Sequence, residues 1–118
     1  SPELKVYKDD FGSRKGNNCL VADFGGKVVG VVWTRIMDEY GHVDDETPSF
    51  AISLYKEYRK QGIGSQLVVK MLELLKWQGY EKASLAVQKA NYAVRMYEKV
   101  GFKIVDENDE EYIMVCEL

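Results

Sequence analysis

The sequence has 118 residues, a length that fits one domain and leaves no room for two. Apolar residues make up 46% and charged residues 30%, a balance typical of a folded globular chain rather than a disordered one. The net charge of −3 argues against nucleic-acid binding, and no apolar run approaches the roughly 20 residues that span a bilayer. We therefore expect a single folded domain at 1–118 that binds neither nucleic acid nor membrane.

The first half of the chain reads as strands joined by turns. Residues 1–17 are polar and contain glycine, so we expect a short helical or irregular lead-in there. The pair Gly25-Gly26 predicts a tight turn, and residues 38–48 predict a loop. Strands are predicted for 18–24, 27–37 and 50–55.

Helical periodicity begins after Gly64. The apolar positions that repeat at this spacing are Leu67, Val68, Met71, Leu72 and Leu75. Gly79 is expected to end this helix, and Asn91 can cap a second one that ends at Gly101. Further strands are predicted for 83–87, 102–105 and 112–115. The order β-β-β-α-β-α-β-β predicts an α/β (α+β) fold with a mixed, mostly antiparallel sheet flanked by helices.

The most informative segment is 54–65, where a strand leads through a basic, glycine-containing loop into a helix. The first N–H groups of a helix have no internal partner, and the helix dipole adds positive charge there. Gly62 and Gly64 would let a phosphate approach the backbone, and Lys56, Arg59 and Lys60 add cations. The P-loop and dinucleotide-binding patterns do not match. A glycine-rich helix start with exposed charges is the alternative interpretation.

Two motifs resemble one known family. Residues 59–64, Arg-Lys-Gln-Gly-Ile-Gly, are similar to the R/Q-x-x-G-x-G/A signature of the GCN5-related N-acetyltransferases (GNAT). Residues 91–102 resemble the family's second motif, which here contains Asn91, Ala93, Tyr97 and Gly101-Phe102. The resemblance covers roughly residues 18–118, and the two motifs agree with the family in order and separation.

The resemblance implies a GNAT-type sheet in which the strand of Leu54 splays from the strand of Val87. It implies acetyl-CoA as cosubstrate, an amine as acceptor and direct attack on the thioester. The implied catalytic residues are Tyr97, which protonates the departing thiolate, and Leu54, whose amide polarises the thioester carbonyl. The implied cofactor-binding residues are Ile52, Leu54, Tyr55, Arg59, Lys60, Gln61, Gly62, Ile63, Gly64, Ser65, Asn91, Ala93 and Tyr97. No metal site is expected.

The acceptor side departs from the family. Some members that acetylate protein N-termini have a glutamate where this chain has Ala86, so the general base is open, with the loop 42–46 as a candidate. The 17-residue lead-in is too short for all of the family's usual N-terminal strand and helices, so we expect the chain to be either truncated there or completed by another subunit, as in a homodimer. We expect Leu4, Val6, Tyr7 and Phe11 to form the remains of a helix.

Two alternatives remain open at this point. One is a non-catalytic acyl-CoA-binding or regulatory module, and the other is a protein-interaction domain with a coincidental glycine loop. Cys19 and Cys116 lie far apart in apolar surroundings, which predicts two reduced, buried thiols and a cytoplasmic location.

Overall fold

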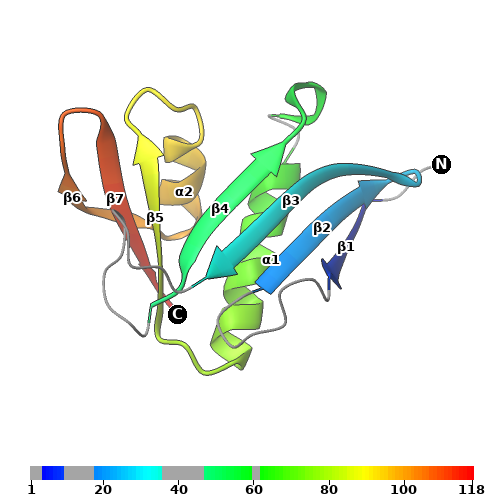
Figure 1. The fold of residues 1–118 in the computed structure, drawn as a ribbon, viewed down its shortest axis with the longest axis horizontal. Coiled ribbons are helices and arrows are strands. Elements are labelled where there is room, and N and C mark those ends of the chain that lie inside the picture. Colours follow the sequence, from blue (N-terminus) through cyan, green and yellow to red (C-terminus); the bar gives the residue numbers. More distant parts are fainter. Residues whose placement is uncertain (1–3, 10–17, 36–46, 60–61) are drawn as a thin grey trace.

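A computed structural model describes residues 4–9, 18–35, 47–59 and 62–118. In these ranges the chain forms a seven-stranded sheet and two α-helices (Figure 1). The strands are β1 (Leu4–Asp9), β2 (Asn18–Phe24), β3 (Lys27–Arg35), β4 (Ser49–Leu54), β5 (Lys82–Gln88), β6 (Lys103–Glu107) and β7 (Glu111–Glu117). The helices are α1 (Ile63–Trp77) and α2 (Val94–Val100), with a 3-10 turn, η1 (Lys56–Tyr58), before α1.

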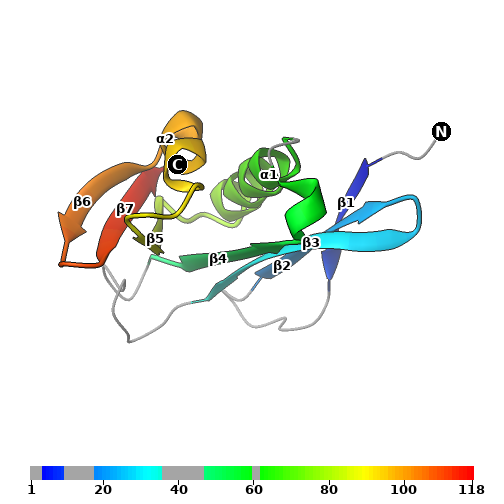
Figure 2. The ribbon, with the colours of Figure 1, turned by 90° about the horizontal axis from the view of Figure 1, so that it is seen from above.

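The strand order is β1-β2-β3-β4-β5-β7-β6, and β4–β5 is the parallel pair among antiparallel neighbours. Both helices pack on the same face of the sheet (Figure 2). The predicted fold class, a mixed and mostly antiparallel sheet with helices on it, is confirmed.

The predicted apolar stripe of α1 forms the centre of the core. Leu67, Val68, Met71 and Leu75 are fully buried against the sheet. The helix ends as expected, because Gly79 adopts the left-handed conformation with φ of +95°. None of the helices in the described ranges is long and apolar enough to cross a membrane.

The β2–β3 hairpin also follows its sequence signal. Gly25 and Gly26 have φ of +63° and +86°, which a side chain would disfavour. Asp23 Oδ1 accepts a hydrogen bond from the Gly26 N–H at 2.9 Å. At the far end of β2, the buried Asn18 exchanges two 2.9 Å amide hydrogen bonds with Gln78, which ties the sheet to the end of α1.

The prediction of a helix near the N-terminus is wrong, because residues 4–9 form the strand β1. Leu4 and Val6 are half-buried while Lys5 and Tyr7 are exposed, an alternation of period two. β1 pairs antiparallel with β2 from Leu4 opposite Phe24 onward. The expectation that an N-terminal strand is lacking therefore fails as well, while Phe11 lies outside the described residues.

The two parallel strands meet at one point and then diverge. Ser49 and Ser84 form the single register pair of β4 and β5, with their buried hydroxyl oxygens 3.3 Å apart. The Ser84 N–H donates to the Pro48 carbonyl at 3.0 Å. Beyond this vertex the strands separate toward Leu54 and Val87 (Figure 1), as the family resemblance implied.

Neither Cys19 nor Cys116 is in a disulfide bond. Cys116 is buried as predicted, and burial raises the pKa of its thiol. Cys19 differs from the expectation, since it is only half-buried on β2.

Candidate functional site

A pocket of about 380 Å³ lies between the end of β4, the start of α1 and the helix α2. Its walls come from the end of β4, the loop before α1, the first residues of α1, and α2 with the loop before it. The lining residues are Ile52, Ser53, Leu54, Arg59, Gly62, Gly64, Ser65, Asn91, Tyr92, Ala93, Met96, Tyr97 and Lys99.

The start of α1 forms one wall and is built from glycine. Gly62 precedes the helix with φ of +81°, and the Gln66 N–H donates to its carbonyl at 3.1 Å to close the first turn. A Cβ on Gly64 would stand 3.1 Å from Met96 Sδ and 3.9 Å from Leu54 Cδ2. Glycine therefore keeps open a cradle at the helix start, where main-chain donors and the helix dipole favour an anion.

Cationic side chains add to this preference for an anion. Arg59 and Lys99 both line the pocket. The Arg59 guanidinium stands 5.2 Å from the centre of the Tyr92 ring, a cation–π contact that joins the two loops across the pocket. No carboxylate or imidazole lines the pocket in the part of the chain that the structure describes.

Tyr97 lies on α2 and is held by aromatic packing. Its ring is 6% exposed and contacts Phe102 edge-on at 5.8 Å between centroids, and Phe102 contacts Phe50 of β4 at 5.6 Å. Burial, together with the neighbouring Tyr92, raises the pKa of Tyr97 to about 12. The phenol therefore carries its proton throughout the neutral range and can donate it in a hydrogen bond.

This raised pKa predicts a loss of stability in strong alkali. Near pH 10 the phenol ionises in the unfolded chain, but in the folded chain its pKa is about 12, so the folded state retains the proton longer. The free energy of unfolding should thus fall by about 2 kcal/mol between pH 10 and pH 12 on account of this residue. Denaturant titrations at pH 9 and pH 12 check this. Tyr97→Phe should lose less stability over that interval, and an equal loss in both proteins would contradict the assignment.

The prediction that Asn91 caps α2 is wrong, because the helix begins at Val94 with Ala93 as its N-cap and no side-chain capping bond. Asn91 instead closes a turn just before the helix. Its Oδ1 accepts a hydrogen bond from the Ala93 N–H at 2.8 Å, and its carbonyl accepts one from the Val94 N–H at 3.3 Å. These bonds turn the chain so that Asn91 and Ala93 both line the pocket.

The structure brings most of the predicted site residues together. The predicted residues that line the pocket are Ile52, Leu54, Arg59, Gly62, Gly64, Ser65, Asn91, Ala93 and Tyr97. Two predicted residues do not line it: the Tyr55 side chain is 56% exposed beneath Lys27, and the Ile63 side chain is buried in the core. Lys60 and Gln61 lie outside the described residues.

Four lining residues were not predicted: Ser53, Tyr92, Met96 and Lys99. Met96 and Lys99 are three residues apart on α2 and therefore share a face, a signal that the helical spacing already contained. Tyr92 directly follows Asn91, and Ser53 lies between Ile52 and Leu54.

The described residues do not identify a general base at the positions that the sequence suggested. Position 86 on β5 is an exposed alanine, which offers no carboxylate. The loop 42–46, the other candidate, lies outside the described residues.

The chain belongs to the acetyltransferase (GNAT) family, because the family's model matches residues 1–102. The probable N-acetyltransferase camello of Xenopus laevis is 32% identical over 91 residues, which cover 74% of this chain and 39% of that protein. The ribosomal protein bS18-alanine N-acetyltransferase of Haemophilus influenzae is 35% identical over 68 residues, covering 58% and 47%. This chain thus spans about two fifths of the length of the first relative and under half of the second.

Solved structures share the fold. A GNAT-family acetyltransferase from Streptococcus pneumoniae superposes with a TM-score of 0.78 at 25% identity, covering 90% of this chain and 69% of that one. The PaiA N-acetyltransferase from Thermoplasma acidophilum, solved in complex with coenzyme A, gives a TM-score of 0.73 at 22% identity, covering 85% and 60%.

Proposed function

We propose that the protein transfers the acetyl group of acetyl-CoA to an amine, which attacks the thioester directly. The observation that carries this proposal is that the glycine-built start of α1 and Tyr97 of α2 line one pocket at the end of β4, beside the gap that opens between β4 and β5. Membership in the acetyltransferase (GNAT) family supports the same activity.

The residues present fit the cosubstrate. The cradle that a Cβ on Gly64 would fill suits a diphosphate, with Arg59 and Lys99 as counter-charges and the first N–H groups of α1 as donors. Acetyl-CoA would supply the activated acetyl thioester.

The free edge of β4 supports a role for Ile52 and Leu54. The Tyr55 N–H donates to the Val29 carbonyl of β3 at 3.1 Å. Successive N–H groups of a strand point to opposite edges, so those of Leu54 and Ile52 point away from β3 and toward the gap. In this position the Leu54 amide can stabilise negative charge that develops on the carbonyl oxygen.

Tyr97 supplies the proton donor on the other side of the gap. The amine nitrogen forms a bond to the carbonyl carbon, the carbon–sulfur bond breaks, and the nitrogen loses one proton while the sulfur gains one. With a pKa of about 12, the phenol is a weak acid that first stabilises the thiolate by hydrogen bonding. The proton that the amine releases restores the phenol after transfer.

The test is an assay of the purified protein with acetyl-CoA and a panel of amines and peptides, in which free thiol is measured. We expect thiol release that depends on the amine, and a rise in melting temperature with coenzyme A because the ligand binds the folded state. A melting shift without thiol release for any acceptor would favour the non-catalytic acyl-CoA-binding module. If neither a melting-temperature shift nor thiol release were observed, the proposal would be contradicted.

The cellular compartment is a further part of the proposal. Cys19 and Cys116 are free thiols, which supports a reducing, cytoplasmic environment.

A further inference from the structure

The face of the sheet opposite the helices carries two cross-strand rows of side chains that end at the gap. Val32 lies in the core beneath α1, so its neighbours Val31 and Trp33 point to the opposite face. The register defines the first row as Tyr7, Val21, Val31 and Ser53, and the second as Asp9, Cys19, Trp33 and Ala51.

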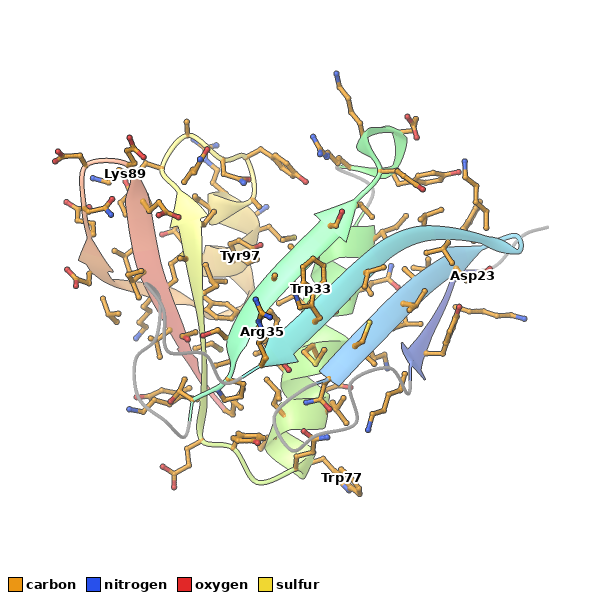
Figure 3. The ribbon with its side chains drawn as sticks, viewed as in Figure 1. Asp23, Trp33, Arg35, Trp77, Lys89 and Tyr97 are labelled. Carbon is orange, nitrogen blue, oxygen red and sulfur yellow. The ribbon has the colours of Figure 1, made fainter. Side chains whose placement is uncertain are left out.

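Trp33 is the large side chain closest to the gap in these rows. It is 38% exposed, and its partner Ala51 lies on β4, two residues beyond the Ser49–Ser84 vertex. Alanine ends at Cβ, so Ala51 covers little of the neighbouring indole. Figure 3 shows Trp33 and Arg35 on the face turned toward the viewer, over β3 and β4, with α1 behind the sheet.

The two sides of the gap differ in charge. The helix side carries Arg59, Lys99 and the start of α1. On the opposite side the rows next to the gap carry valine, tryptophan, alanine and serine, and the charge in them belongs to Asp9 on the outermost strand. The rows on either side of these two contain further charged residues, namely the pair Lys5 and Asp23 on one side and Arg35 on the other.

This asymmetry separates the two substrates. An anionic cosubstrate that fills the helix side leaves the opposite face of the sheet for the approach of the acceptor to the thioester carbonyl. Ser53 belongs to the first row and also lines the pocket, so this face continues directly into the site.

We propose that Trp33 determines acceptor specificity by binding the hydrocarbon part of an apolar amine whose nitrogen enters the gap. The inference rests on the proposed acetyl transfer and adds the substrate class. A fully buried methylene contributes about fourfold to binding, so the preference should grow along a series of straight-chain amines.

Intrinsic fluorescence gives a readout that does not depend on activity. The chain has two tryptophans, and Trp77 is 83% exposed at the end of α1, so Trp77→Phe leaves Trp33 as the only indole. In the presence of coenzyme A, hexylamine should shift the emission of this variant at concentrations where methylamine does not. Identical emission with both amines would overturn the inference.

Kinetics with the same two amines complete the test. Their nitrogens have nearly the same pKa, so a difference in kcat/KM reports the hydrocarbon part and not the reactivity of the nitrogen. In the wild-type protein kcat/KM for hexylamine should exceed that for methylamine by about tenfold or more. Trp33→Thr, which keeps a good strand residue, should abolish most of this ratio, while the matched Trp77→Thr should preserve it. If this hexylamine-to-methylamine ratio of kcat/KM were equal in the wild type and Trp33→Thr, with methylamine still acetylated, the role of Trp33 would be refuted and the acetyl transfer would stand. If the wild type acetylated none of the amines and peptides in the panel, the acetyl transfer itself would be refuted.

Discussion

Replacing Tyr97 with phenylalanine is expected to lower kcat by about 100-fold while the affinity for coenzyme A stays close to that of the wild type. The substitution removes one hydroxyl group and keeps the ring, whose edge contact with Phe102 at 5.8 Å holds α2 against the sheet. The departing thiolate then loses its proposed proton donor, so the loss should appear in kcat rather than in binding. Steady-state kinetics and calorimetric titration with coenzyme A measure the two effects separately.

Tyr80→Phe is the matched control. Tyr80 is half-buried, and burial raises its pKa as it raises that of Tyr97, but it does not line the pocket. This variant should keep wild-type turnover. If Tyr97→Phe and Tyr80→Phe were equally active, Tyr97 would have no part in the chemistry.

Local patterns predicted the secondary structure wherever the period was clear. The apolar stripe of α1 and the Gly25-Gly26 turn are local signals, and both are confirmed. β1 was missed because its six residues carry only three alternations and precede a polar, glycine-containing stretch. Its strand character comes from pairing with β2, a contact between segments that local patterns do not report.

The motifs predicted most of the pocket, but not the contacts across it. The approach of Gly64 to Met96, and of Arg59 to Tyr92, joins residues more than 30 positions apart in the sequence. The spacing of the motifs indicates which residues belong to the site, whereas the packing of α2 against α1 determines which of their side chains face one another. The exposure of Tyr55 and the burial of Ile63 also depend on tertiary structure and could not be predicted from the motif.

The cations and the helix start lie on one side of the gap, so the two motifs have distinct roles in the proposed reaction. The first motif supplies the helix start and Arg59, to which the proposed function assigns recognition of the anionic cosubstrate. The second motif supplies Tyr97, which is the proposed proton donor to the sulfur. Neither motif reaches the face that carries Trp33, so the acceptor preference can change without loss of cosubstrate binding.

Gly64→Val is expected to weaken coenzyme A binding at least tenfold, or by about 1.4 kcal/mol. The valine Cβ would stand 3.1 Å from Met96 Sδ, and its two methyl groups would extend into the space between Met96 and Leu54. Both neighbours line the pocket, so the new side chain fills the cradle at the start of α1. Because Met96 is flexible, it can move aside and the fold should survive, which thermal unfolding verifies.

Gln66→Val separates this steric effect from the cost of a β-branched residue in a helix. Gln66 is exposed on the same helix, two residues further on, and does not line the pocket. Its variant should bind coenzyme A as the wild type does in calorimetric titration. If Gly64→Val folded and bound with unchanged affinity, the start of α1 would not hold the cosubstrate, because no ligand could occupy that cradle together with the valine side chain.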